Sequence, residues 1–318
     1  QGTLGVIRPT FEEYANRYHG GELCVYTPAS EDFSYGAGDI EDYFADKGIS
    51  ALVLVNPDNP SGNFLAKNEL EHLIRWTKER NILFLADESF VDFADGPDAS
   101  LLNEDLLDAN PHLIVIKSIS KSYGVPGLRL GIAASGDAAL INRLKKDVSI
   151  WNINSIGEFY MQIEEKYRKD YAASLDKLRA ERARLAGLLS AIPGLRVFPS
   201  QANYLMAELT VPGPRQAGEA VLAAEGLLLT TGEQALAAEE QPLAAEEQPL
   251  AAGGRPLSAS QLTERLLNEH HILIKDLTAK IQRDGRQFIR IAVRNEADDN
   301  RLVRALEEIY RPFFISSR

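Results

Sequence analysis

The residue with the clearest chemical potential in this sequence is a lysine in a turn rich in Ser and Gly. Ser118 and Ser120 precede Lys121, and Arg129 follows eight residues after the lysine. A lysine amine can form an imine with an aldehyde when burial and neighbours keep part of it unprotonated. Hydroxyl groups and a planar guanidinium suit a phosphate group. The stretch therefore predicts a lysine-centred site that also holds a phosphate.

Two plainer interpretations of the same stretch stay open. Most lysines are solvated surface charges, and Lys117 is a second lysine only four residues away. Lys117 belongs to the apolar run before the turn and lacks the spacing to the hydroxyls, so Lys121 is the better candidate.

Two further motifs follow apolar runs that read as strands. Residues 56–62, with the sequence NPDNPSG, follow the run 51–55, and their prolines and glycine predict a fixed turn. Asp87 follows the run 82–86, and a carboxylate there is costly to bury unless it is paired, for example with a protonated pyridine nitrogen. Open α/β sheets bind ligands at the carboxyl ends of their strands. A simple turn, and a helix cap or surface acid, are the alternatives.

Arginine provides the fourth motif, near the end of the chain. Arg290 lies in the strand-like run RIAVR, which ends at Arg294. A strand arginine can clamp a substrate carboxylate with its planar fork. A surface salt bridge is the alternative.

The elements that must position these residues alternate between strand-like and helix-like stretches. Several apolar runs are continuous, as in strands that are covered on both faces. This β-α-β alternation predicts a mostly parallel sheet with helices on both faces. The expected strands are Gly5–Ile7, Leu23–Tyr26, Ala51–Val55, Ile82–Ala86, Leu113–Lys117 and Leu130–Ala134. The expected helices are Thr10–His19, Asp39–Lys47 with Asp39 as its N-cap, and Lys67–Arg80 with Leu70, Leu73, Ile74 and Thr77 on one stripe.

The pattern changes after residue 150. Residues 155–191 read as one long helix that stops at Pro193-Gly194. The sequence thus predicts a large domain over residues 1–154 and a smaller α+β domain over residues 155–318. The second domain is expected to contain strands at Leu195–Phe198, Tyr204–Leu209 and Phe288–Val293 and helices at Leu262–His270 and Asp299–Tyr310.

Within the second part, four tandem units of seven begin at Gln234, and most of their length lies in residues 232–257. Pro242, Pro249 and Pro256 recur once per unit. Proline inside a helix costs about 3 kcal/mol, which excludes a continuous coiled coil. We expect an inserted loop without chemistry of its own.

The bulk properties exclude several classes. The 318 residues carry a net charge of −12, which argues against nucleic acid and anionic membranes as main partners. The single cysteine, Cys24, cannot form an internal disulfide, and no signal peptide or apolar membrane span stands out. The five histidines lack zinc-site spacing, so no metal is expected. These features are typical of a cytoplasmic protein.

Together the four motifs resemble the class I/II aminotransferases, the fold-type-I enzymes that depend on pyridoxal phosphate (PLP). The likeness is greatest to the branch with histidinol-phosphate aminotransferase and threonine-phosphate decarboxylase, and it covers nearly all of the chain outside 232–257. It implies an aspartate-aminotransferase-type large domain and a homodimer. It also implies a further N-terminal part, with a helix start whose amides hold the phosphate, that this sequence lacks.

The resemblance also implies a role for each site residue. Lys121 would form the Schiff base and shuttle the proton, and Asp87 would pair with the pyridine N–H. Arg290 would clamp the substrate carboxylate. The remaining cofactor-binding residues would be Phe11 stacked on the ring, Asn59 as donor to the cofactor O3′, and Ser118, Ser120 and Arg129 on the phosphate. Phe90 stands where many members have a tyrosine, which would leave Asn59 as the main O3′ donor.

Three functions follow from the resemblance. The first is an aminotransferase for a small amino acid or keto acid, with or without a phosphate group. The second is a decarboxylase of threonine phosphate or serine phosphate, toward which Phe90 and the Arg290–Arg294 pair lean slightly. The third is a non-catalytic or truncated relative. Trp151, Asn152 and Asn154 are expected as walls of the substrate pocket.

Overall fold

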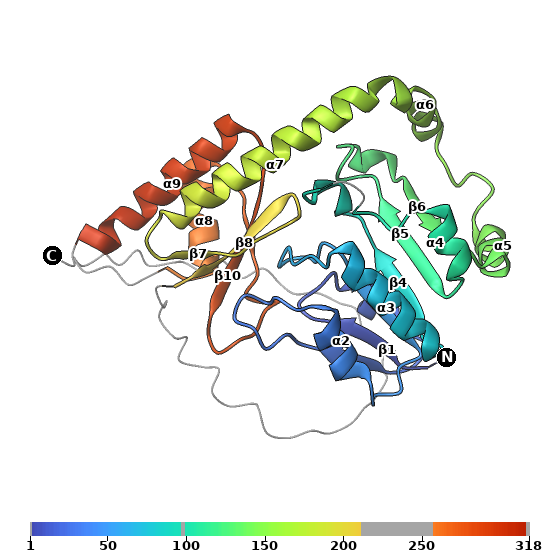
Figure 1. Ribbon diagram of the computed structural model, residues 1–318. Coiled ribbons are helices and arrows are strands. Elements are labelled where there is room, and N and C mark those ends of the chain that lie inside the picture. Colours follow the sequence, from blue (N-terminus) through green and yellow to red (C-terminus); the bar gives the residue numbers. More distant parts are fainter. Residues whose placement is uncertain (1, 97–98, 211–256, 316–318) are drawn as a thin grey trace, which may run out of the picture.

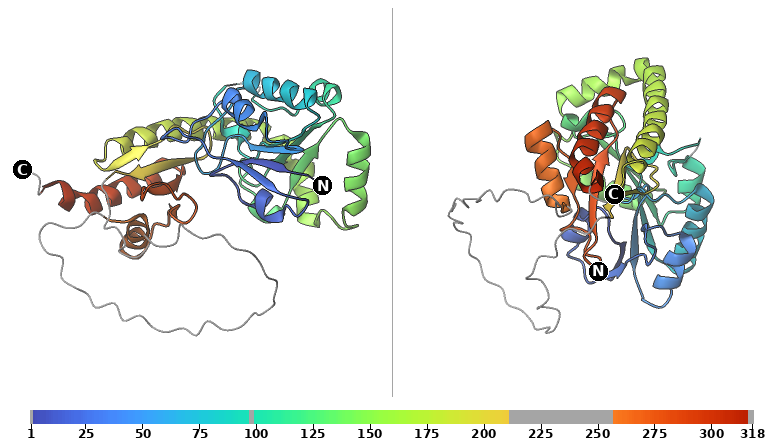
Figure 2. Two further views of the ribbon diagram at one scale, coloured as in Figure 1. Left: turned by 90° about the horizontal axis from the view of Figure 1, so that it is seen from below. Right: turned by 90° about the vertical axis from the view of Figure 1, so that its left-hand side faces the viewer.

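The computed structural model describes residues 2–96, 99–210 and 257–315, and it contains two sheets (Figure 1). The predicted heptapeptide loop at 232–257 lies outside these residues, apart from Leu257. The two units lie side by side, each around its own sheet (Figure 2). Within the described ranges, no helix is long and apolar enough to cross a membrane.

The first sheet has six strands, and all neighbours are parallel except the last pair. The strand order is β2-β1-β3-β4-β5-β6. Three of these strands are buried along most of their length, as expected for a parallel sheet that is covered on both faces. The mostly parallel α/β sheet predicted from the sequence is thus confirmed. The strands are β1 (Leu4–Ile7), β2 (Leu23–Tyr26), β3 (Ala51–Val55), β4 (Leu83–Asp87), β5 (Leu113–Ser118) and β6 (Gly131–Ala134).

Some of the helices around this sheet bury apolar side chains against it. In α3 (Lys67–Glu79), the predicted stripe residues Leu70, Leu73, Ile74 and Thr77 are all buried. Burying a Leu or Ile side chain stabilises the fold by about 1.5–3 kcal/mol. The remaining elements are α1 (Glu13–Arg17), α2 (Ala37–Phe44), α4 (Glu104–Ala109), α5 (Ala138–Asp147) and the short 3₁₀ helices η1 (Val91–Phe93) and η2 (Pro126–Leu128).

One predicted cap is wrong. Helix α2 begins after Gly36, so Asp39 is the third residue of the helix and not its N-cap. Its carboxylate instead accepts a hydrogen bond from the Gly36 backbone N–H at 2.8 Å. The carboxylate therefore still satisfies an N–H group at the start of the helix.

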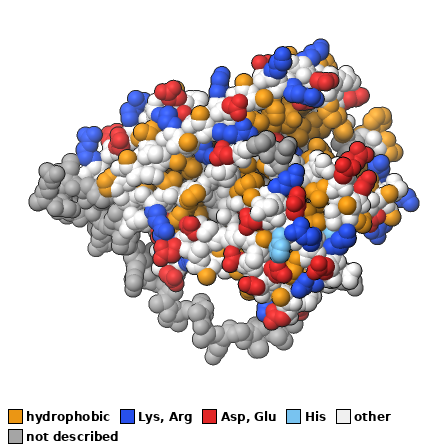
Figure 3. Space-filling model, in the orientation of Figure 1, with side chains coloured by type: hydrophobic (Ala, Val, Ile, Leu, Met, Phe, Trp, Pro, Cys, Tyr) orange, Lys and Arg blue, Asp and Glu red, His pale blue; other side chains and the backbone are white. Residues whose placement is uncertain are grey.

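The predicted single helix over residues 155–191 is divided. It consists of α6 (Ser155–Ile163), the 3₁₀ turn η3 (Glu164–Tyr167) and α7 (Arg168–Ser190). Helix α7 runs across the top of the molecule from α6 toward the second sheet (Figure 1). Around α6 several large apolar side chains are exposed, and the space-filling view shows apolar groups gathered there (Figure 3).

The second sheet has the order β7-β8-β10-β9 and only antiparallel neighbours. One face packs on α7 and the two C-terminal helices, through residues such as Leu185, Leu205 and Leu306. The other face holds Met206 and Phe288, which pack against Phe33 of the first unit. The bounds are β7 (Leu195–Val197), β8 (Tyr204–Leu209), β9 (Lys275–Asp276), β10 (Gln287–Ala292), α8 (Ala259–His270) and α9 (Glu296–Ile315).

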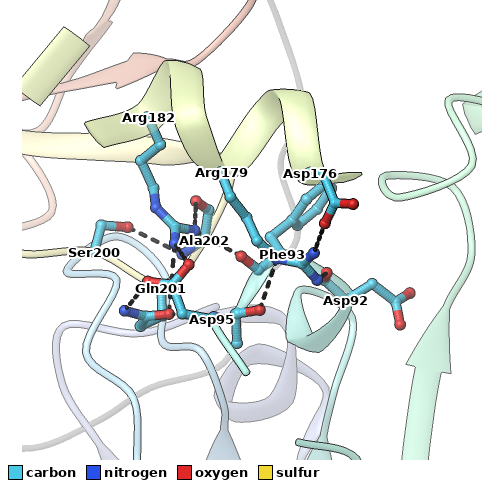
Figure 4. Close-up of polar contacts among 10 residues, drawn as sticks. Asp92, Phe93, Asp95, Asp176, Arg179, Arg182, Ser200, Gln201 and Ala202 are labelled. Carbon is cyan, nitrogen blue, oxygen red and sulfur yellow. Dashed lines mark hydrogen bonds and ion pairs between the residues drawn. The ribbon is translucent and has the colours of Figure 1, made fainter. Parts of the chain in front are cut away.

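A buried arginine joins the two units. The Arg182 guanidinium, on α7, donates to the carbonyl oxygens of Phe93 (2.7 Å) and Ala202 (3.0 Å) and to the Asp95 carboxylate (2.8 Å). One helix turn earlier, Arg179 donates to the carbonyls of Ala94 and Asp92 (Figure 4). One face of α7 therefore holds both the segment after β4 and the segment before β8.

Candidate active site

The candidate site lies at the carboxyl edge of the first sheet. Strands β1, β3, β4 and β5 are parallel, and the register pairs Val55 with Asp87 and Asp87 with Ile116. Their last residues therefore lie along one edge, where open α/β sheets bind ligands. Asp87 ends β4, and the segments that follow β1, β3 and β5 carry Phe11, Asn59 and Lys121.

Asp87 is the last residue of β4 and is buried. Its Oδ1 accepts hydrogen bonds from the Ser89 backbone N–H (2.9 Å) and hydroxyl (2.5 Å). Its Oδ2 accepts a hydrogen bond from the Tyr14 hydroxyl at 2.7 Å. Burial and the adjacent carboxylate raise the pKa of Tyr14, so this hydroxyl remains a donor.

The carboxylate of Asp87 has no cationic partner within the described ranges. It takes part in no ion pair there, although burying a charge is costly unless it is paired. A positively charged group at this edge would complete its environment. Phe11 lies nearby, with its ring edge-on to Tyr14 at 6.1 Å between centroids, and it is partly exposed.

The NPDNPSG turn is held by Asp58, a buried carboxylate that our sequence analysis did not single out. Its Oδ1 accepts from the Thr10 hydroxyl (2.9 Å) and the Asn59 backbone N–H (2.8 Å). Its backbone carbonyl accepts from the Tyr204 hydroxyl at 2.6 Å. Asp58 therefore orients Asn59, while Tyr204 ties the turn to the second sheet.

The end of the same turn requires a glycine. Gly62 has φ +77°, and a Cβ there would meet Ser200 atoms at 2.2–2.9 Å, backbone included. The Gly62 carbonyl accepts a hydrogen bond from the Gln201 backbone N–H at 3.0 Å. Left-handed backbone and close approach both favour glycine, so this residue lets the turn contact the second unit.

Burial raises the pKa of the Asp58 carboxyl to about 7, against donors that lower it. Between about pH 4 and pH 7 the folded chain keeps a proton there that the unfolded chain loses, so its stability falls as pH rises through this window. Above about pH 7 the effect is constant. We expect Asp58→Asn, which resembles the protonated carboxyl, to lose this slope and to be more stable at pH 8 by a few kcal/mol.

Urea unfolding at pH 5, 6, 7 and 8 measures this slope. The exposed Asp42→Asn is the matched control, and it should follow the natural chain at each pH. A slope that is unchanged in Asp58→Asn would place the titration elsewhere, for example at Asp299, whose pKa burial also raises to about 7.

Lys121 lies in the turn after β5 and is exposed in the isolated chain. Its Nζ lies over the Phe90 ring, 5.2 Å from the centroid. Tyr123, two residues on, stacks on Tyr171 of α7 with centroids 4.1 Å apart and planes 9° apart. A cation over a ring face and a fixed neighbouring aromatic hold the lysine over the site. Lys117, by contrast, forms an ion pair with Asp92 at 2.6 Å.

The predicted phosphate ligands are only partly brought together. The Ser120 backbone N–H donates to the Ser118 hydroxyl at 3.3 Å, so these two serines share one turn. Arg129 is in the left-handed region and donates to the Pro126 carbonyl of its own turn at 3.2 Å. No hydrogen bond or ion pair joins Arg129 to either serine. Arg129 instead lines a hollow with Tyr123, Asn152 and Tyr160.

The three residues that were expected to line the substrate pocket lie in different surroundings. Asn152 lines the hollow beside Arg129. Asn154 caps α6, since its Oδ1 accepts from the Gly157 N–H at 2.8 Å. Trp151 is 89% exposed and does not line that hollow.

Arg290 crosses from the second sheet to the site. Its guanidinium donates to the Asn59 Oδ1 at 2.6 Å and lies 5.0 Å from the Tyr204 ring centroid. Tyr204 in turn meets Phe90 edge-to-face at 5.2 Å. Lys121 therefore contacts the Phe90 ring of this pair, and Arg290 contacts the Tyr204 ring. Lys280 also reaches this point, donating to the Asn59 carbonyl at 3.2 Å.

Tyr14, Asp58 and Lys280 are site residues that were not predicted from the sequence. Tyr14 follows the predicted Phe11 by three residues, and Asp58 lies inside the predicted NPDNPSG turn. Both residues are therefore close in sequence to predicted site residues. Lys280 had no signal, because only the pairing of β9 with β10 and the packing of their connection bring it near Asn59.

Comparison with known proteins identifies relatives of the whole chain. The sequence profile of aminotransferase class I and II matches residues 6–308. A CMP-5'-(3-aminopropyl)phosphonate synthase from Streptomyces rubellomurinus is 29% identical over 309 residues, which cover 97% of this chain and 42% of that protein. An L-serine phosphate decarboxylase from Sulfurospirillum multivorans is 28% identical, over 97% of this chain and 68% of that protein.

Among solved structures, the fold is similar to that of the histidinol-phosphate aminotransferase from Clostridium acetobutylicum. The TM-score is 0.75 at 21% identity, over 97% of this chain and 78% of that one. This likeness concerns the fold alone, and it agrees with the mostly parallel sheet and the smaller antiparallel sheet described above.

Proposed function

The chain belongs to the aminotransferase class I and II family, and on that premise we propose that it decarboxylates a small phosphorylated amino acid, such as serine phosphate or threonine phosphate. The family depends on PLP. The serine phosphate decarboxylase and the phosphonate synthase, both similar over 97% of this chain, support the phosphorylated substrate. Because the Sulfurospirillum relative is a decarboxylase, we rank decarboxylation ahead of the transamination that the sequence alone favoured.

One geometric observation carries the proposal: a cation from the second sheet points at the cofactor edge of the first. Arg290 bonds to Asn59, and it forms no ion pair with a carboxylate among the described residues. An arginine without a carboxylate partner suits a substrate carboxylate as a bidentate ligand. The amino acid would then lie between Arg290 and Lys121.

The residues at the sheet edge fit the cofactor. Asp87 offers a buried carboxylate that lacks a cation, which suits a protonated pyridine nitrogen. The Asn59 Nδ2 donates to no described residue, so it is available to a phenolate oxygen. Ser118 and Ser120 would hold the phosphate, and Phe11 would cover the ring. Arg129 would join the phosphate only by leaving its bond to Pro126.

When bound, PLP supplies an aldehyde and a ring that accepts electrons. The chain supplies the rest. Asp87, held in place by Tyr14 and Ser89, would accept a hydrogen bond from the pyridine N–H. Arg290 fixes the substrate carboxylate. In decarboxylation the bond from Cα to the carboxylate breaks, carbon dioxide leaves, and the Lys121 Nζ can give Cα the replacing proton.

Product analysis tests this function on the full chain loaded with PLP. With O-phosphoserine and no keto acid, we expect sustained release of carbon dioxide and one equivalent of phosphoethanolamine per carbon dioxide. Conversion limited to one turnover per site, with the cofactor left as the amine, would instead establish the aminotransferase that the family's description suggests. Failure to take up PLP would favour a non-catalytic relative.

We also propose that the chain acts as a cytoplasmic homodimer. Exposed apolar side chains around α6, such as Ile150 and Trp151, support a covered surface in the assembled protein. Sedimentation at micromolar concentration should give twice the chain mass, and a monomer would contradict the proposal.

A further inference from the structure

Lys280 lies in the connection between β9 and β10 and points at the candidate site. It is half-buried, and its Nζ donates to the Asn59 carbonyl at 3.2 Å. Arg290 donates to the side-chain oxygen of the same Asn59 at 2.6 Å. Two cationic groups from the second unit therefore meet on one residue of the first.

These cations lack an anionic partner in direct contact. Lys280 forms no ion pair within 4.0 Å in the described chain, and neither does Arg290. The nearest acids have other partners. The Asp58 carboxylate accepts from Thr10 and Asn59, and Glu12 pairs with Arg8 at 3.0 Å.

Charges of both signs surround Lys280. Asp58 and Glu12 act on it as opposite charges, and Arg290 and Lys275 act on it as like charges. Burial, the largest cause, lowers the pKa of Lys280. Grouping cations in a partly desolvated place costs free energy unless an anion joins them. The arrangement therefore suits a ligand with more than one negative charge.

We propose that Lys280 binds the phosphate or phosphonate group of the substrate, while Arg290 binds its carboxylate. This inference rests on the proposed function for the identity of the substrate. A phosphate monoester carries −1.5 to −2 charges near pH 7, and lysine is a frequent phosphate ligand that acts as a point charge. Lys280 thus selects the phosphorylated amino acid over its unphosphorylated counterpart.

A non-reacting probe separates binding from turnover. 3-Phosphonopropionate carries a carboxylate and a phosphonate but no amino group, while propionate and succinate supply one and two carboxylates. On the PLP-loaded full chain, calorimetry should show that Lys280→Met weakens 3-phosphonopropionate by about 10- to 100-fold. Propionate binding should stay unchanged, and Lys280→Arg should restore most of the loss.

Lys275→Met is the matched control, since Lys275 contributes charge without touching Asn59. A loss as large in Lys275→Met, or none in Lys280→Met, would overturn the assignment. So would succinate binding as tightly as 3-phosphonopropionate, because the second acid group would then be a carboxylate. An equal urea midpoint in Lys280→Met excludes a merely structural role.

The two proposals fail separately in this experiment. If O-phosphoserine is not decarboxylated but 3-phosphonopropionate binding depends on Lys280, the reaction is wrong and the site is right. If decarboxylation occurs with the same KM in Lys280→Met, the reaction is right and the role of Lys280 is wrong.

Discussion

Lys121→Met should lower turnover by about 100- to 10,000-fold, the range for loss of a positioned acid–base group. The unbranched methionine keeps the apolar contact with the Phe90 ring, so the protein should remain folded. After borohydride reduction, mass spectrometry of the natural chain should find the cofactor mass on the peptide that holds Lys121. The variant should give no such adduct.

Lys117→Met is the control for this experiment. Lys117 pairs with Asp92 at 2.6 Å, so its loss should reduce stability and leave the adduct in place. An adduct on Lys117, or full activity in Lys121→Met, would move the catalytic centre to another lysine. Circular dichroism at the assay temperature ensures that both variants are compared as folded proteins.

Arg182→Met should lower the free energy of unfolding by about 2–5 kcal/mol. The substitution leaves the carbonyls of Phe93 and Ala202 without a donor in a buried place, and each such orphan costs about 1–3 kcal/mol. Urea unfolding measures the loss. Because Arg182 joins α7 to segments of both units, the transition could also separate into two steps.

Two milder variants distinguish the carbonyl bonds from the charge pair. Asp95 is 61% exposed at its side chain, so Asp95→Asn should cost less than about 1 kcal/mol. The loss in free energy of unfolding for Arg179→Met should lie between those for Arg182→Met and Asp95→Asn. The Arg179 side chain is partly exposed, so water can replace part of its hydrogen bonding. An Arg182→Met loss no larger than that of Asp95→Asn would contradict the importance of the two carbonyl bonds.

Local patterns in the sequence predicted the first sheet well. Continuous apolar runs such as Ala51–Val55 mark buried strands, and their order gives the edge where Asn59 and Asp87 lie. The stripe of α3 follows directly from its helical period. Such features depend on residues close in the chain, which is why one sequence suffices to predict them.

Features that depend on distant contacts escaped prediction. Residues 164–167 contain neither Pro nor Gly, so nothing local marks the 3₁₀ turn that divides the long helix. Nothing in the local sequence distinguishes Arg182 from the other arginines of its helix, because its partners Phe93 and Ala202 are distant in the sequence. The bond of Arg129 to Pro126 depends on backbone geometry in a turn that composition does not specify.

The bond between Arg290 and Asn59 has a consequence for selectivity. If Arg290 binds the substrate carboxylate as we propose, that carboxylate must replace the Asn59 oxygen to which Arg290 donates at 2.6 Å, so one hydrogen bond is exchanged for another. A weakly accepting ligand gains little affinity from this exchange, because its hydrogen bond to Arg290 is no stronger than the hydrogen bond to Asn59 that it replaces. Only a fully charged acceptor gains, and as it does so it frees Asn59 to reorient. We therefore expect neutral amino-acid analogues, such as amides and esters, to bind more weakly than the free carboxylate.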